Sequence, residues 1–157
     1  MSSPTIRRAE TNPDLEAVRR LFRDYINSLD FALDFQDVED ELEALPGPYA
    51  APGGAILLAE YDGSAVGVVA VQPLDADGVC EMKRLYVCPS ARGRGIGRTL
   101  GTAILDVARD LGYDTMRLDT VASMKPARAL YRSIGFEERS AYYHNPLDDV
   151  VYMERSL

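Results

Sequence analysis

The chain of 157 residues has no tryptophan, one histidine and only two cysteines. Cys80 and Cys88 stand eight positions apart around one expected strand. An extended chain advances about 3.3 Å per residue, so a separation of roughly 26 Å excludes a disulfide between them. Neither cysteine has the neighbouring ligands of a metal site. We therefore expect reduced cysteines and no bound metal.

Long apolar runs are missing as well. The longest, Val68 to Val71 with its neighbours, is far too short to span a membrane, and the N-terminal residues lack the apolar stretch of a secretory signal. Basic residues are also few, since 17 lysines and arginines stand against 25 acidic residues, for a net charge of −8. This balance argues against nucleic acid or an anionic membrane as the main partner. We expect a cytoplasmic protein.

What is present fits a globular protein. The hydrophobic share of 46% and the charged share of 27% are ordinary for soluble domains, and the length suits one domain over residues 1–157. The charge is unevenly distributed, because residues 24–50 hold eight acidic residues and no lysine or arginine. Residues 83–98, in contrast, hold five basic residues and no acidic one. The second stretch therefore stands apart in an acidic chain.

Hydrophobic periodicity predicts the secondary structure. Apolar residues at steps of three and four predict helices at residues 12–29, 35–45, 96–111 and 125–133. Alternating or short apolar runs predict strands at residues 5–9, 55–61, 65–72, 79–87, 115–120, 136–141 and 150–154. This order implies an α/β domain with a mixed sheet and helices on both faces.

A segment rich in arginine and glycine, residues 90–100, joins an expected strand to an expected helix with the sequence SARGRGIGRTL. Glycines allow several backbone N–H groups to turn toward one point, and the start of a helix favours an anion there. The segment is therefore either a cradle for a diphosphate or a tight turn with solvated arginines. It lacks the Gly-Lys-Ser/Thr of a Walker loop, and its third glycine stands one residue too early for a dinucleotide-binding fingerprint.

Three motifs carry a resemblance to a known family. Residues 92–97, RGRGIG, match the pattern Arg/Gln-x-x-Gly-x-Gly/Ala and resemble the acyl-CoA pyrophosphate loop of the GNAT superfamily of N-acetyltransferases. Residues 83–89, KRLYVCP, resemble the strand that leads into this loop. Residues 127–136, ARALYRSIGF, resemble the family's Ala-x-x-Leu-Tyr-x-x-x-Gly-Phe segment. The motifs stand in the family's order, and the resemblance covers nearly the whole chain, most weakly over residues 13–54.

The resemblance implies a GNAT-like fold with a mixed, mostly antiparallel central sheet and helices on both faces. It also implies transfer of an acetyl group from acetyl-CoA to a primary amine of a small molecule or peptide, by direct attack in a ternary complex. In similar proteins, backbone amides of the strand and the loop bind the pantetheine, the acetyl carbonyl and the pyrophosphate. The residues that the resemblance places against the donor are Leu85, Tyr86, Val87, Arg92, Gly93, Arg94, Gly95, Ile96, Gly97, Arg98 and Thr99.

Tyr131 matches the tyrosine that donates a proton to the departing CoA thiolate in many family members. A phenol suits this task because it stays protonated at pH 7 and is a good hydrogen-bond donor. The alternative is a tyrosine packed in the core one turn after Ala127.

Glu81 lies six residues before Val87, the spacing at which the histone-modifying members carry their catalytic glutamate. An alkylammonium must lose a proton before it can attack, and such a carboxylate could accept that proton directly or through water. The alternative is an ordinary strand glutamate paired with Lys83, two residues on and on the same face.

Three other positions complete the sequence-based hypothesis. His144 is expected to be a surface turn residue rather than a base. Met124 stands where the family often has an asparagine that hydrogen-bonds the cofactor arm, so the resemblance does not carry that bond over. Residues 24–43 fall where the family builds one wall of its acceptor site. Their negative charge would attract a cationic amine, and solvated helix faces explain the same residues equally well.

The sequence leaves some alternatives open. A CoA-binding sensor or interaction module without turnover is one, and a domain that binds another diphosphate nucleotide is a second. A homodimer is compatible with the sequence, which does not determine the oligomeric state.

Overall fold

A sheet of seven strands runs through the centre of the computed structural model, which describes residues 3–29, 35–143 and 149–157. Across the sheet the described strands follow the order β1 (Thr5–Arg8), β2 (Ala55–Tyr61), β3 (Ser64–Pro73), β4 (Val79–Val87), β5 (Thr115–Val121), β7 (Val150–Ser156) and β6 (Glu137–Arg139). Of these neighbouring pairs, β4 and β5 alone are parallel. The predicted mixed, mostly antiparallel sheet is confirmed.

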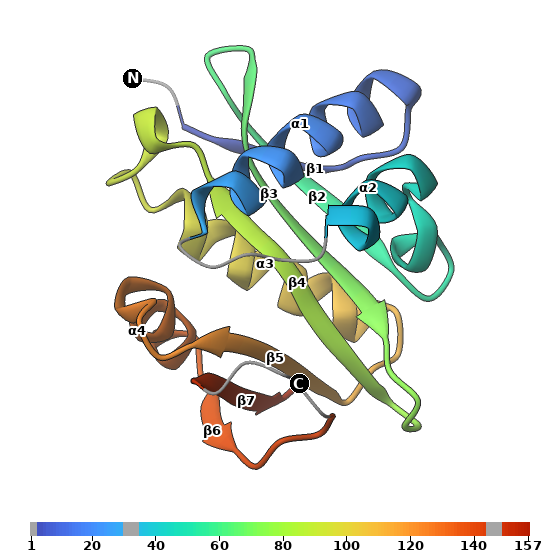
Figure 1. The fold of residues 1–157 in the computed structure, drawn as a ribbon, viewed down its shortest axis with the longest axis vertical. Coiled ribbons are helices and arrows are strands. Elements are labelled where there is room, and N and C mark those ends of the chain that lie inside the picture. The colour runs from blue at the N-terminus through green and yellow to red at the C-terminus, as the bar shows by residue number, and fades with distance from the viewer. Residues whose placement is uncertain (1–2, 30–34, 144–148) are drawn as a thin grey trace.

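Helices cover both faces of this sheet (Figure 1). One face carries α1 (Asn12–Ser28) and α2 (Phe35–Ala44), and the other carries α3 (Ile96–Asp110). The short helix α4 (Lys125–Ser133) follows β5 and contacts α3. The elements have the predicted order, with the last strand longer than expected. The strand expected at residues 136–141 is shorter, because only Glu137–Arg139 pair with β7.

Two apolar clusters hold the helices to the sheet. Side chains alternate along a strand, so Leu57 of β2 joins the cluster beneath α3 while Leu58 joins the cluster beneath α1. The buried residues of α3 in the first cluster are Ile96, Leu100, Ile104, Leu105 and Ala108, and those of α1 and α2 in the second are Val18, Leu21, Phe22 and Leu42. Burial of one leucine or phenylalanine contributes about 1.5–3 kcal/mol, so these side chains hold the three helices against the sheet.

The two cysteines are free thiols. Cys80 is fully buried in the cluster beneath α3, and burial raises the pKa of its thiol to about 12. A thiol with that pKa stays protonated and unreactive at neutral pH. No helix in the described part of the chain is both long and apolar enough to cross a membrane.

A capping box stabilises the start of α1, and an arginine of β1 binds to it. Thr11 Oγ1 accepts a hydrogen bond from the Asp14 amide (3.2 Å), and the Asp14 carboxylate accepts one from the Thr11 amide (3.1 Å). Arg7 donates two further hydrogen bonds to this carboxylate, at 2.7 and 2.9 Å. The bonds from Arg7, followed by those from the backbone, hold the pKa of Asp14 well below its usual range.

Asp14→Ala is expected to lower the free energy of unfolding by about 1–2 kcal/mol at pH 7, because it removes the acidic half of the capping box and the acceptor of two Arg7 hydrogen bonds. Because folding lowers the pKa of Asp14, its contribution is full above the ordinary carboxyl pKa of about 4 and is lost as the pH falls further. Urea unfolding at pH 7 and pH 3 measures both effects. Glu16→Ala, at an exposed position of the same helix, is the matched control. A loss for Asp14→Ala that is the same at both pH values would contradict this role.

Candidate active site

The parallel pair β4 and β5 separates partway along its length. The strands pair from Val79 opposite Thr115 to Glu81 opposite Arg117, and the pairing stops there although β4 continues to Val87. Figure 1 shows the two strands diverging toward α4. Beyond Glu81 this edge of β4 therefore has no neighbour among the described strands, and its backbone groups can pair with a ligand.

A bulge lies in β4 where the gap opens. The register with β3 shifts by one residue between Lys83 and Tyr86, and Arg84 has a φ of +58°. A residue other than glycine rarely adopts this left-handed conformation, and a bulge increases the local twist of its strand. The bulge bends β4 just beyond the point where its pairing with β5 ends.

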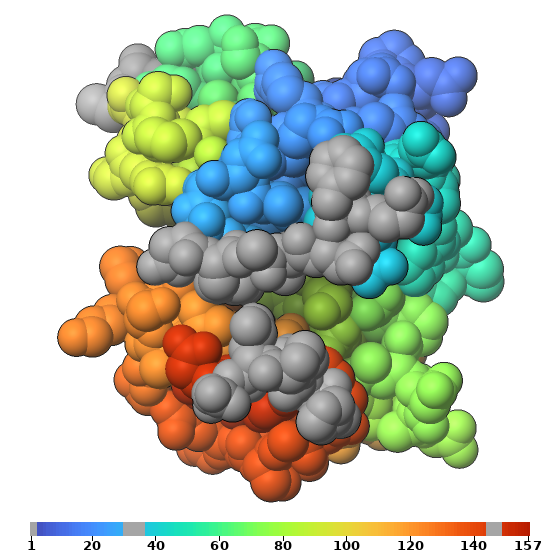
Figure 2. All heavy atoms as spheres, in the orientation of Figure 1, coloured from blue at the N-terminus to red at the C-terminus, as the bar shows by residue number. Residues whose placement is uncertain are grey.

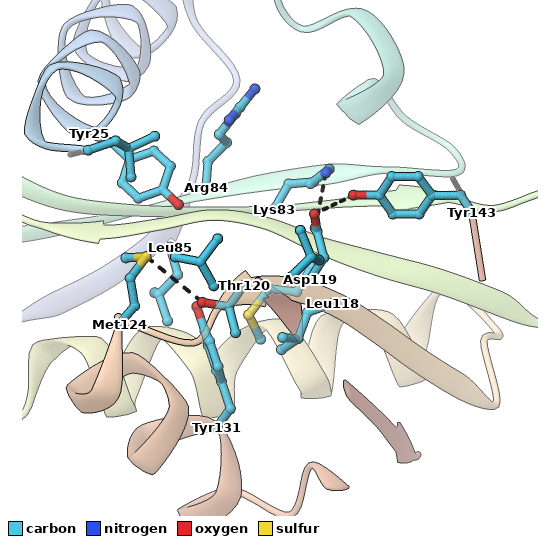
Figure 3. Close-up of a pocket in the computed structure, with 14 residues that line it drawn as sticks. Tyr25, Lys83, Arg84, Leu85, Leu118, Asp119, Thr120, Met124, Tyr131 and Tyr143 are labelled. Carbon is cyan, nitrogen blue, oxygen red and sulfur yellow. Dashed lines mark hydrogen bonds and ion pairs between the residues drawn. The ribbon is translucent and has the colours of Figure 1, made fainter. Parts of the chain in front are cut away.

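A cavity of about 240 Å³ lies in the gap between β4 and β5. Its walls come from β4, β5, the end of α1, α4 with its N-cap, and the start of β7 (Figure 3). The described lining residues are Tyr25, Leu29, Met82, Lys83, Arg84, Leu85, Leu118, Asp119, Thr120, Val121, Met124, Tyr131, Tyr143 and Val150. In the space-filling view the left outline of the molecule is notched between the yellow-green segment, which leads into residues 92–97, and the orange α4 (Figure 2).

The glycine loop, residues 92–97, presents backbone N–H groups without a hydrogen-bond partner on the described backbone. Gly95 is the N-cap of α3 with a φ of +75°, and a Cβ there would meet no atom within 4 Å. The amides of residues 93–98 donate none of the backbone hydrogen bonds found among the described residues. None of the ion pairs found there involves Arg92, Arg94 or Arg98. Successive free amides at a helix start, with three uncompensated guanidinium groups, can bind an anion of high charge.

The loop is continuous with the gap. Arg92 donates from Nε to the carbonyl of Val87, the last residue of β4 (3.1 Å). A Cβ at Gly97 would lie 3.5 Å from Leu130 and 3.7 Å from Val87, so the start of α3 packs directly against α4 and the end of β4. An extended ligand can therefore run from the loop along β4 into the cavity.

Tyr131 of α4 combines both roles that the sequence allows. Its ring is 9% exposed, belongs to the cluster beneath α3 and packs edge-on against Phe136 with centroids 6.2 Å apart. Its hydroxyl end points into the gap (Figure 3) and makes no hydrogen bond to a described residue. Burial raises the pKa of this phenol, and the charges of Tyr25 and Asp119 add to the effect. The group is therefore a protonated donor facing the cavity.

Glu81 lies beside this cavity rather than in it. It is 3% exposed and lines a neighbouring pocket of about 430 Å³, together with Lys83 and Tyr142. Gln72 donates to Oε1 (2.7 Å), and the hydroxyl of Tyr142 donates to Oε2 (2.5 Å). Lys83 Nζ is 3.5 Å from Oε1, so the alternative pairing considered from the sequence is also present. Burial and the charge of Glu81 raise the pKa of Tyr142.

Several lining residues were not singled out from the sequence. Asp119 of β5 accepts hydrogen bonds from Lys83 (3.4 Å) and from the hydroxyl of Tyr143 (Figure 3). Tyr25 reaches the cavity from α1, where burial raises its pKa. Alternation along residues 115–121 could have placed Asp119 and Arg117 on one face. No local sequence pattern indicates that this face of β5 adjoins the face of β4 that carries Glu81.

Two acidic residues of 24–50 form ion pairs with arginines of the same chain. Glu39 pairs with Arg23 (2.7 Å), and Glu41 pairs with Arg84 through two hydrogen bonds of 2.9 and 3.1 Å. None of the described acidic residues of this stretch lines the cavity. The expectation of a cationic acceptor therefore gains no support from them.

Two other expectations concern single residues. Met124 caps α4 and lines the cavity, where Thr120 Oγ1 lies 3.9 Å from its sulfur. It offers no donor in place of the amide that the family often has there. His144 lies outside the described residues, so its role as a turn residue stays a prediction.

Comparisons with known proteins agree with this geometry. The model of the family described as Acetyltransferase (GNAT) family matches residues 15–136. A protein of Schizosaccharomyces pombe, named as an uncharacterized N-acetyltransferase, is 42% identical over 145 residues, which cover 92% of this chain and 89% of that protein. An N-acetylaspartate synthetase of Xenopus tropicalis is 32% identical over 122 residues, 76% of this chain and 43% of that protein. The structure of YncA from Salmonella typhimurium with its cofactor acetyl-CoA has a TM-score of 0.74 at 22% identity, covering 99% of this chain and 94% of that one.

Proposed function

Because the chain belongs to the GNAT family of acetyltransferases, we propose that it transfers an acetyl group from acetyl-CoA to the primary amine of a small molecule or peptide. The observation that carries this proposal is the gap between β4 and β5. One backbone edge without a strand partner leads from the glycine loop to the cavity that Tyr131 lines. The relative named for N-acetylaspartate adds free amino acids to the acceptors worth testing.

Two parts of the chain have groups that suit acetyl-CoA. The amides of residues 93–98 and the guanidinium groups beside them suit the pyrophosphate. The unpaired edge of β4 from Leu85 to Val87 offers N–H and C=O groups to the two amides of pantetheine, as a neighbouring strand would. Acetyl-CoA supplies the activated acetyl group as a thioester.

The chemistry is a direct transfer. The amine nitrogen attacks the thioester carbonyl, the N–C bond forms, and the C–S bond breaks. Backbone amides of β4 beside Leu85 stabilise the negative charge that develops on the carbonyl oxygen. Tyr131 gives its proton to the departing thiolate, a role supported by its position in the cavity, and its raised pKa keeps the phenol protonated until then. Cys80 is not a nucleophile in this scheme, because its buried thiol is protonated.

The proton on the amine needs an acceptor, and we assign this role to Glu81. Lys83 and Tyr143 line both its pocket and the cavity with Tyr131, so a water at their boundary can link the amine to the carboxylate. Tyr142, bonded to the same carboxylate, holds it in place.

Glu81→Gln is expected to lower turnover by about 10²-fold or more near neutral pH, with little change in acetyl-CoA affinity. Because rising pH deprotonates the free amine, part of the loss should be recovered at high pH. Steady-state rates from pH 6 to pH 10 with a saturating amine measure the loss of turnover and its recovery. Calorimetry measures the affinity for acetyl-CoA. A loss that does not vary with pH would assign Glu81 a structural role.

A thiol-release screen tests the proposed function itself. The chain is incubated with acetyl-CoA and amines, amino acids, polyamines or peptides, and free CoA is measured against a control without acceptor. We expect release that depends on the amine and an acetylated product by mass spectrometry. Binding of acetyl-CoA without release on any amine would contradict the proposal, and displacement of acetyl-CoA by ATP or NAD would assign the loop to another nucleotide.

A further inference from the structure

The charges that line the cavity are unevenly signed. Among the described lining residues, Lys83 and Arg84 are positive and Asp119 is negative. Glu41 of α2 and Glu81 of β4 do not line it, but each pairs with one of these cations, so a ligand meets the donors of two cations rather than a net positive charge. Hydrogen bonds to charged donors in a partly enclosed site are stronger than in water, which makes these donors matter for the choice of ligand.

The two cations are consecutive residues that share one side of their strand. Successive side chains of a regular strand point to opposite faces, so neighbours do not normally enter the same cavity. The bulge and the left-handed backbone of Arg84 remove this alternation. Figure 3 shows Lys83 and Arg84 on the same side of β4. A strained residue that places a second cation in the cavity indicates a functional constraint.

Neighbouring carboxylates orient both cations without closing them off. Glu41 of α2 takes the Nε and Nη2 donors of Arg84, and neither bond uses Nη1. The Arg84 side chain lines the cavity and is 18% exposed, so Glu41 and the neighbouring Tyr49 hold its guanidinium group without burying it completely. Lys83 is held between Glu81 (3.5 Å) and Asp119 (3.4 Å). A guanidinium group has five donors, so a second carboxylate can bind beside Glu41.

We propose that Arg84 and Lys83 bind a carboxylate of the acceptor, and that the acceptor is a small amino-carboxylic acid. This inference rests on the proposed function, because it names the substrate class of the same site. Asp119 lies in the same cavity and attracts the ammonium end of such a molecule. The cavity of about 240 Å³ must also admit the acetyl end of the donor, which limits the part of the acceptor that the cavity can enclose. The acceptor is thus zwitterionic or anionic, the reverse of the cationic amine expected from residues 24–43.

The test compares matched acceptors. Free amino acids and the corresponding carboxamides are offered at saturating acetyl-CoA, and kcat/KM is obtained from CoA release. The ratio of acid to carboxamide is expected to exceed about tenfold, the usual effect of one hydrogen bond to a charged group. The carboxamides carry more free amine at neutral pH, so preference for the acid cannot come from amine protonation. Equal or faster release with carboxamides would overturn the inference while leaving the proposed function intact, whereas no release with any amine would overturn both.

Two substitutions separate binding from packing. Arg84→Met keeps the length and the backbone strain and removes the charge, and it should lower the acid-to-carboxamide ratio about tenfold or more. Glu41→Gln breaks the same ion pair and keeps Arg84, so it should preserve or raise the ratio. Equal falls in both variants would show that Arg84 only ties α2 to the sheet, and would overturn the inference. Lys83→Met, which leaves the Arg84–Glu41 pair in place, should lower the ratio as well.

Discussion

Gly95→Val is expected to abolish measurable binding of acetyl-CoA and to leave the fold intact. The φ of +75° at Gly95 is strained for a β-branched residue, which costs about 1–3 kcal/mol and turns the neighbouring amides away from their common point. The new side chain would project into the open space in front of the loop, where a Cβ meets no protein atom within 4 Å. It would therefore occupy the position proposed for the pyrophosphate. Isothermal calorimetry measures the binding, and circular dichroism measures the fold.

Gly112→Val provides the matched control for this substitution. Gly112 follows the other end of α3, has a φ of +96° and also has no atom within 4 Å of its Cβ position. The two variants therefore introduce the same side chain into similar backbone strain at opposite ends of one helix. Gly112→Val should lose stability and keep acetyl-CoA binding. A folded Gly95→Val that binds acetyl-CoA like the parent would assign the loop another role.

Tyr131→Phe is expected to cut turnover by roughly 10- to 10⁴-fold while acetyl-CoA still binds. The substitution keeps the ring in its contact with Phe136 and removes a hydroxyl that bonds to no described residue, so little stability should be lost. Without the donor the thiolate must leave unprotonated. The defect should therefore shrink when the leaving thiol is replaced by a more acidic one. Rates with natural and activated acetyl thioesters, at a saturating amine, measure both effects.

Tyr113→Phe is the matched control for the loss of a phenol. Its hydroxyl donates to the carbonyl of Gly53 (2.5 Å), and it does not line the cavity. This variant should lose about 1 kcal/mol of stability, the value of one hydrogen bond, and keep its turnover. If Tyr131→Phe works at the parental rate, the donor is another group, with Tyr142 and Tyr143 the first to be tested.

The order of the elements and the glycine loop could be predicted because their signals are local. Apolar residues at Ile96, Leu100 and Ile104 predict α3, and a glycine at position 112 predicts its end. The three glycines between a strand and a helix predict the open loop in the same way. Tyr131 was found through the motif around it, and the structure adds that its hydroxyl end faces the cavity.

The gap and the charges within it depend on contacts that no local pattern contains. The parallel pairing of β4 with β5 ends at Glu81, just before the bulge at Arg84, and no residue of β4 marks this bulge in the sequence. The pairing of Glu41 with Arg84 joins residues 43 positions apart, so the acidic stretch could not be known to be partly neutralised. The sequence does not indicate Asp119, because its role depends on its contact with Lys83, which lies on another strand.

A crystal structure of the complex with acetyl-CoA tests the central claim most directly. The account predicts pyrophosphate oxygens within hydrogen-bond distance of the amides of residues 93–98 and pantetheine along the unpaired edge of β4. The acetyl group should lie in the cavity between Leu85 and Tyr131, with the sulfur near the Tyr131 hydroxyl. A donor bound elsewhere, or a thioester outside the gap between β4 and β5, would contradict the account.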